Sequence, residues 1–104
     1  MPGCPACHDY LPRFHAQVKR FADVGQPFVY YDNGHGIPAG VIPIFVLDAT
    51  STDPEIQALA DAHGVTGMPT TLLLTQRARP VKIEGAADDP EIYELLRSAC
   101  YANR

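Results

Sequence analysis

Two cysteines separated by two residues stand near the start of the chain, in the run Cys-Pro-Ala-Cys at residues 4–7. A helical pattern follows this run, so Cys4 falls at the N-cap of the expected helix. Unpaired backbone N–H groups and the positive end of the helix dipole favour a thiolate at that position. Pro5 suits the first helical turn, where a missing N–H costs nothing. The placement of the two thiols points to dithiol–disulfide chemistry.

Two other interpretations of this pair remain open, a structural disulfide and half of a zinc site. Zinc needs two further ligands, which only Cys100 and the four histidines could supply. The sequence contains no second Cys-x-x-Cys and no His-x-x-x-His pair. We therefore favour redox chemistry and expect no metal and no bound cofactor.

The third cysteine and the nearest histidine have both a functional and a structural interpretation. Cys100 lies on the last expected helix, where a small buried apolar residue is a more common role than a third catalytic thiol. His8 directly follows Cys7 and could tune the thiolate electrostatically, or it could simply be solvated in the first helical turn.

The elements that must position the cysteines begin with a helix over residues 5–24. Its apolar face has the three-and-four spacing of a buried stripe, at Leu11, Phe14, Val18 and Phe21. Pro12 lies inside this helix, where it removes one backbone hydrogen bond and should produce a kink.

The rest of the chain alternates between short strands and helices. Residues 28–31 form an aromatic, strand-like run that is more often core than a partner-facing patch, and residues 32–40 have the composition of a loop. Residues 41–47 are almost continuously apolar, as in a strand covered on both faces, whereas Pro43 within the run is typical of an edge strand or a bulge. A helix begins with Asp53 as N-cap and ends at Gly64. Two antiparallel strands at 70–75 and 79–84, joined at 76–78, and a last helix starting at 88–91 complete the order.

Length and composition fit one domain, residues 1–104. The protein is 46% hydrophobic and carries a formal net charge of −4, which argues against general nucleic-acid binding. No apolar run reaches the roughly 20 residues of a membrane span. The N-terminal residues do not resemble a signal peptide, and three cysteines are an odd number, so we expect a cytoplasmic protein.

A second motif lies in the run Gly-Val-Thr-Gly-Met-Pro-Thr at residues 64–70. A proline directly before a buried strand and after Gly-x-Met fits a tight turn with a cis peptide bond between Met68 and Pro69. Only about 5% of such bonds are cis in folded proteins, so this prediction depends on its combination with the cysteine motif.

Taken together, these motifs resemble the thioredoxin-like superfamily over nearly the whole chain. Four features carry the resemblance, and they occur in the family's order: the Cys-x-x-Cys run that opens a helix, Pro12 five residues after the second cysteine, the Gly-Met-Pro-Thr loop, and Gly85 after the second hairpin strand. The run around the cysteines is also similar to that of glutaredoxins. The resemblance implies a thioredoxin-like α/β fold, with a mixed central sheet flanked by helices.

The resemblance also implies roles for five residues. Cys4 would be the exposed nucleophile and Cys7 the more buried resolving thiol. Pro69, in cis, would prevent a backbone clash over the thiols. The backbone of Met68 would pair with an extended substrate, and Gly85 would leave room beside the groove.

The chain departs from the family pattern before the motif. Gly3 stands where thioredoxins usually have Trp, and the central strand that normally precedes the motif, often with a buried acid, has no counterpart in three residues. The fold is then N-terminally truncated relative to the family, and the missing strand would separate the strand at 41–47 from the one at 70–75 and leave both edges unpaired. The true chain could begin upstream, residues 28–31 could replace some of the lost pairing, or a partner chain could donate a strand.

Two functions follow from these observations. The first is a thiol–disulfide oxidoreductase that acts on protein or small-molecule disulfides through Cys4 and Cys7 and takes its electrons from a reductase or glutathione. The second is a thioredoxin-like structural or interaction subunit of a larger assembly, in which the cysteine pair is vestigial or a staple.

Overall fold

A computed structural model describes residues 4–32, 35–48, 50–75 and 79–102. The chain is a mixed α/β structure with three helices, α1 (Pro5–Asp23), α2 (Pro54–Ala62) and α3 (Asp89–Ala102), within this part. Its strands are β1 (Phe28–Tyr30), β2 (Ile42–Ile44), β3 (Thr70–Leu73) and β4 (Val81–Glu84). The order of elements matches the sequence prediction, although every strand is shorter than expected. The expected hairpin turn at 76–78 lies outside the described residues.

The strands form two separate pairs in the described residues. β1 and β2 are parallel, with Phe28 opposite Ile42, and β3 and β4 are antiparallel, with Thr70 opposite Glu84. The antiparallel pair confirms the predicted hairpin strands. The single mixed central sheet is not observed, because no described strand lies between β2 and β3 and joins the two pairs. The expectation that residues 41–47 are covered on both faces is wrong, since Phe45 and Val46 are exposed.

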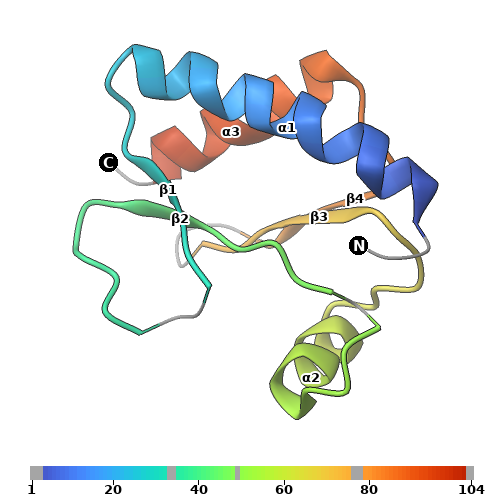
Figure 1. The fold of residues 1–104 in the computed structure, drawn as a ribbon. Coiled ribbons are helices and arrows are strands. Elements are labelled where there is room, and N and C mark those ends of the chain that lie inside the picture. Colours follow the sequence, from blue (N-terminus) through green and yellow to red (C-terminus); the bar gives the residue numbers. More distant parts are fainter. Residues whose placement is uncertain (1–3, 33–34, 49, 76–78, 103–104) are drawn as a thin grey trace.

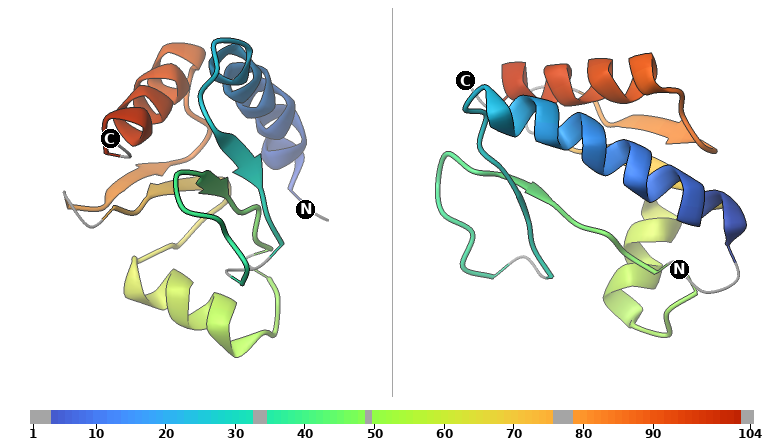
Figure 2. Two further views of the ribbon diagram at one scale, coloured as in Figure 1. Left: turned by 90° about the vertical axis from the view of Figure 1, so that its left-hand side faces the viewer. Right: turned by 45° about the horizontal axis from the view of Figure 1, so that its top comes forward.

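The helices lie on opposite sides of the strands. Figure 1 shows α1 and α3 side by side above the strands and α2 below them, and both views in Figure 2 agree. The core lies on the α1/α3 side. Its buried residues are Tyr10, Val18, Phe21, Ala87, Ile92, Leu96 and Cys100. α2 contributes no buried residue, although Asp53 caps it as predicted through a 2.9 Å hydrogen bond from the Glu55 N–H.

Helix α1 presents a slightly different face to the core than its sequence pattern predicts. Leu11 is only partly buried, whereas its neighbour Tyr10 and Cys7, about one turn before Leu11, are buried. The helix continues through Pro12 without interruption. In the aromatic run after α1, Phe28 packs against the core but Tyr30 is exposed, so only part of that run is core.

Candidate active site

The two cysteines form a disulfide at the start of α1, with their Cα atoms 5.2 Å apart. Cys4 is the N-cap residue, as predicted, and its sulfur accepts a hydrogen bond from the Cys7 N–H at 3.1 Å. The Cys4 carbonyl also accepts from the His8 N–H at 3.2 Å. The bond from His8 is the first i→i−4 bond of α1, whereas the Cys7 N–H has no i−4 partner and is shared between the Cys4 sulfur and the Cys4 carbonyl, each at 3.1 Å.

Neither sulfur is openly exposed in this oxidised state. Cys7 is fully buried, as the resolving thiol should be, but Cys4 keeps only 6% of its surface, so the expected exposed nucleophile is not observed. The Cys4 sulfur is bonded to that of Cys7 and accepts from the Cys7 N–H, so it is turned toward the first turn of α1.

The second motif folds into the turn that its sequence predicts. The peptide bond between Met68 and Pro69 is cis. The Thr70 hydroxyl donates to the Gly67 carbonyl at 2.7 Å and closes the turn on one side. Pro69 is buried and Met68 is partly buried, so the turn packs against the body of the protein.

The structure brings Pro69 and Gly85 together. The Gly85 N–H donates to the Pro69 carbonyl at 2.9 Å, where β3 begins and β4 has just ended. Gly85 has a φ of +79°, in the left-handed region that favours glycine over residues with a side chain. Gly85 remains exposed, so no side chain crowds this side of the turn.

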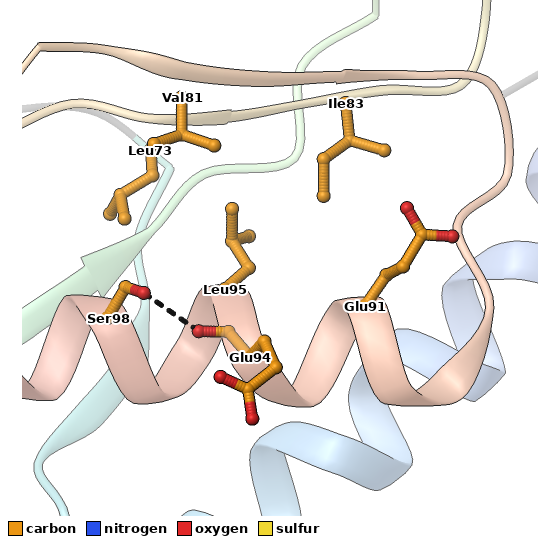
Figure 3. A pocket seen from close by; sticks show the side chains of 7 residues that line it. All are labelled: Leu73, Val81, Ile83, Glu91, Glu94, Leu95 and Ser98. Atoms are coloured by element: carbon orange, nitrogen blue, oxygen red, sulfur yellow. Dashed lines mark hydrogen bonds between the residues drawn. The ribbon is translucent and has the colours of Figure 1, made fainter.

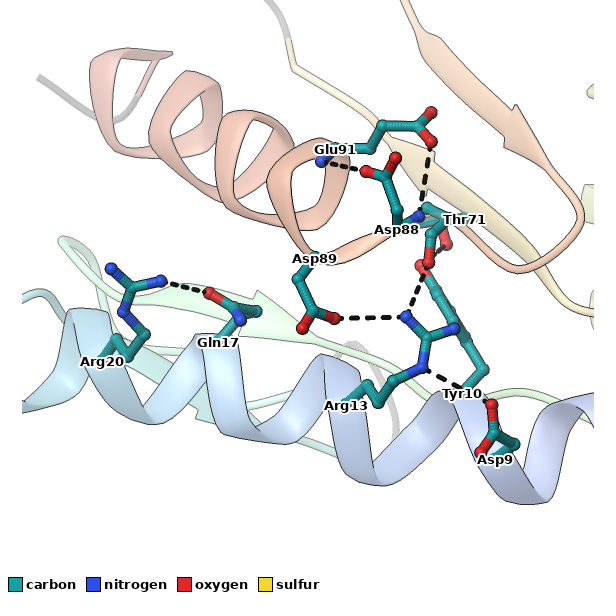
Figure 4. A network of polar contacts seen from close by, with 10 residues as sticks. Asp9, Tyr10, Arg13, Gln17, Arg20, Thr71, Asp88, Asp89 and Glu91 are labelled. Carbon is teal, nitrogen blue, oxygen red and sulfur yellow. Dashed lines mark hydrogen bonds and ion pairs between the residues drawn. The ribbon is translucent and has the colours of Figure 1, made fainter.

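A side-chain hydrogen bond links the cysteine helix to the strand after Pro69. The hydroxyls of Tyr10 and Thr71 are 2.7 Å apart, and Figure 4 shows the tyrosine reaching from α1 to the strand. In Figure 1, α1 and β3 begin at the same end of the molecule. Neither residue was predicted from the sequence. The spacing indicated only that Tyr10 lies on the same face of α1 as Cys7, and no local signal marked Thr71.

Arg13 fixes the same helix to the start of α3. Its guanidinium donates to the Ala87 carbonyl at 2.9 Å and contacts the carboxylates of Asp89 at 3.2 Å and Asp9 at 3.5 Å (Figure 4). Ala87 is two residues after Gly85. The disulfide helix, the turn at Pro69 and the segment after β4 are thus tied together by polar contacts.

Burial raises the pKa of the Tyr10 hydroxyl above the ordinary value for tyrosine. The hydrogen bond with Thr71 and the positive charge of Arg13 oppose this shift, and burial outweighs them. The phenol therefore keeps its proton at neutral pH and can donate to Thr71.

The side chains of the two remaining candidates make none of the contacts described above. His8 is exposed, and Cys100 is buried in α3 as expected. In the part of the chain that the structure describes, no group of three or more His, Cys, Asp and Glu side chains is arranged to hold a metal ion. No described helix is both long and apolar enough to cross a membrane.

An open groove of about 250 Å³ lies between α3 and the β3–β4 pair (Figure 3). None of the predicted site residues lines it. Its lining is mostly apolar, and its two carboxylates are already engaged: Glu94 pairs with Arg97 at 2.8 Å, and Glu91 accepts from the Asp88 N–H at 3.3 Å. The groove therefore offers no convergent polar groups for chemistry.

Comparison with known proteins gives no relative. No family model, curated protein or solved structure matches this chain.

Proposed function

We propose that this chain is a thioredoxin-like thiol–disulfide oxidoreductase that works through Cys4 and Cys7. The observation that carries the proposal is the disulfide at the N-terminus of α1, with the Cys7 N–H donating to the Cys4 sulfur at 3.1 Å. A donor aimed at a sulfur stabilises its thiolate, which is the form that attacks disulfides. A helix N-terminus adds a favourable electrostatic contribution.

The exchange proceeds in two steps from the reduced protein. The Cys4 thiolate attacks one sulfur of a substrate disulfide; a Cys4–substrate disulfide forms, the substrate S–S bond breaks, and one substrate thiolate leaves. Cys7 then loses its proton to solvent, and its thiolate attacks the Cys4 sulfur. The Cys4–Cys7 disulfide forms, and the second substrate thiolate leaves. Two electrons have passed from the protein dithiol to the substrate.

The turn at Pro69 supplies the substrate-binding side in this proposal. The backbone of Met68 pairs with an extended segment of the substrate, as one strand adds to another. Gly85, hydrogen-bonded to the Pro69 carbonyl and without a side chain, leaves room beside that segment. The oxidised protein returns to the dithiol state by taking two electrons from a thiol reductant, either glutathione or a dithiol reductase.

The test is reduction of a peptide disulfide by the purified protein in the presence of a thiol reductant. We expect the wild-type protein and Cys100→Ser to turn over alike, because Cys100 lies outside the proposed site. Cys4→Ser should be inactive. Cys7→Ser should accumulate a mixed disulfide with the substrate, visible by mass spectrometry. Equal background rates for the wild type and Cys4→Ser would refute the proposal.

A second candidate function, a subunit whose sheet is completed by a partner chain, is favoured by a different observation. In the described residues β2 and β3 belong to separate pairs, and apolar side chains next to them, Phe45, Val46 and Leu74, are exposed. Unpaired strand edges with apolar neighbours are a common place for another strand to add. In that case the disulfide would be a staple at the start of α1.

Light scattering and thermal unfolding separate this candidate from an independent enzyme. A subunit that needs a partner strand should associate or unfold without cooperativity when isolated at low concentration. A monomer with one cooperative transition would contradict the partner-dependent function, and the exchange assay would then decide the role of the cysteines.

A further inference from the structure

We propose that Tyr10 and Thr71 are positioning residues for the exchange reaction. Their hydrogen bond fixes the position of the cysteine helix, α1, relative to β3, the strand that follows Pro69. This inference rests on the proposed oxidoreductase function. It goes beyond that function because it assigns a role in the reaction to a pair of side chains that contact neither sulfur in the proposed mechanism.

The position of the pair in the chain supports this role. Tyr10 follows Cys7 by three helical residues, about 4.5 Å along the helix axis. Thr71 follows Pro69 by two strand residues, about 7 Å along the strand. The two halves of the site are the disulfide on α1 and the turn at Pro69. The 2.7 Å hydrogen bond joins them, and it lies roughly one helical turn from the first and two strand residues from the second.

The surroundings of Tyr10 make this link well defined. Its side chain is only 4% exposed, and its ring contacts Phe14, with the centroids 6.0 Å apart. The Arg13 guanidinium lies over the ring at 5.6 Å from its centroid, and the same Arg13 is bonded to the segment before α3. A hydroxyl held in this way by packing has little freedom to find another partner, so removal of either hydroxyl should loosen α1 against β3.

The effect should depend on the substrate. An extended peptide disulfide must engage both halves of the site, because its backbone pairs at Met68 while its sulfur meets Cys4. A small aromatic disulfide needs only access to the Cys4 thiolate. A misalignment of the halves should therefore slow reduction of the peptide disulfide more than reduction of the small disulfide. Displacements of about 1 Å can lower a rate by up to roughly a hundredfold.

The experiment compares kcat/KM for a peptide disulfide and for a small aromatic disulfide. Tyr10→Phe and Thr71→Val each remove one hydroxyl and keep the shape of the side chain. We expect each to lower kcat/KM for the peptide about tenfold, and to lower the peptide-to-small-disulfide ratio by a similar factor. The double variant should be no worse than either single one, because all three lack the same bond.

Two control variants test whether the effect is specific. Thr71→Ser keeps a hydroxyl on β3 and should keep the wild-type ratio. Tyr93→Phe removes a phenol from α3, whose ring packs on Phe21 at 5.0 Å between centroids, and should also leave the ratio unchanged. If Tyr10→Phe does not fold, the test depends on Thr71→Val and Thr71→Ser, whose peptide-to-small-disulfide ratios are then compared.

Three results would overturn the positioning role while leaving the oxidoreductase intact: an unchanged ratio in Thr71→Val, a parallel loss for both substrates, or additive losses in the double variant. A wild-type protein no faster than Cys4→Ser on either substrate would instead refute the oxidoreductase itself and the positioning role with it.

Discussion

The sharpest consequence of the site geometry concerns the acidity of the two thiols once the disulfide is reduced. Two variants isolate them: Cys7→Ser leaves the Cys4 thiol, and Cys4→Ser leaves the Cys7 thiol, each combined with Cys100→Ser to remove the third thiol. The first variant is informative because the stabilising donor is the backbone N–H of residue 7, which the substitution retains. We expect the pKa of the Cys4 thiol to lie below that of a free cysteine and below that of Cys7.

The magnitude follows from the contacts of Cys4. A hydrogen bond to a charged acceptor contributes about 1.5–3 kcal/mol, and the helix dipole about 0.3–1 kcal/mol; the lower part of the first range applies, because the Cys7 N–H is shared with the Cys4 carbonyl at 3.1 Å. Burial of the Cys4 side chain, which is 6% exposed, opposes the charge and removes part of this gain. A net stabilisation of about 2 kcal/mol corresponds to a thiolate population raised roughly thirtyfold over that of an unperturbed thiol. Cys7 is fully buried, so its pKa should be the higher of the two.

The assay is the ultraviolet absorbance of the thiolate followed during a pH titration of each variant, with alkylation rates as an independent check. The Cys4 thiol should ionise at a clearly lower pH than the Cys7 thiol. If the two ionise together, or Cys4 ionises at the higher pH, then burial outweighs the N–H donor and the helix dipole, and our reasoning about the nucleophile is wrong.

Three further predictions concern stability. Asp88→Ala should cost about 1 kcal/mol in urea unfolding, because the Asp88 carboxylate accepts from the Glu91 N–H at 2.9 Å and caps α3. Ile92→Ala, at a fully buried core position, should cost about 2–5 kcal/mol by the same measurement. The whole free energy of unfolding of a domain is typically about 5–15 kcal/mol. Above a pH of about 10, the unfolded chain releases the Tyr10 proton more readily than the folded protein, so stability should fall with rising pH, and less steeply in Tyr10→Phe.

Matched variants check these predictions. Val24→Ala, at a site that is 74% exposed, should change the free energy of unfolding by less than about 0.5 kcal/mol. A similar small value for Ile92→Ala would mean that the α1/α3 core is not packed as described. Identical slopes of stability against pH in the wild type and Tyr10→Phe would contradict the raised pKa of Tyr10.

The local motifs of the site could be predicted from sequence because each depends on short-range physics. An N-cap cysteine followed by Pro5 is a property of neighbouring residues, and the tight turn after Gly-x-Met is local too, although its cis bond was predicted only in combination with the cysteine motif. The N-cap role of Cys4 and the cis bond before Pro69 are both present in the structure, whereas the left-handed conformation of Gly85 was not predicted.

Long-range features were predicted less well. The hydroxyl pair of Tyr10 and Thr71 spans 61 residues, and nothing in the local pattern of either residue indicates the other. The burial of Cys4 depends on how its side chain turns back onto the helix, which residue type alone does not determine. The resemblance implied one mixed central sheet, but the strand that joins its two halves in the family has no counterpart in the residues before the cysteine motif, and β2 pairs only with β1 among the described residues.

The geometry at Cys4 also bears on the direction of the proposed reaction. Whatever stabilises the thiolate stabilises the reduced protein and not the disulfide, because the disulfide sulfur carries no charge for the Cys7 N–H to balance. For this two-electron couple, about 1.4 kcal/mol of such stabilisation raises the reduction potential by about 30 mV. A more stable Cys4 thiolate is more populated at neutral pH and therefore attacks more often. The same stabilisation makes the disulfide more oxidising. In every variant that alters the first turn of α1, a lower pKa of Cys4 should consequently accompany a higher reduction potential of the protein, and a higher pKa a lower potential.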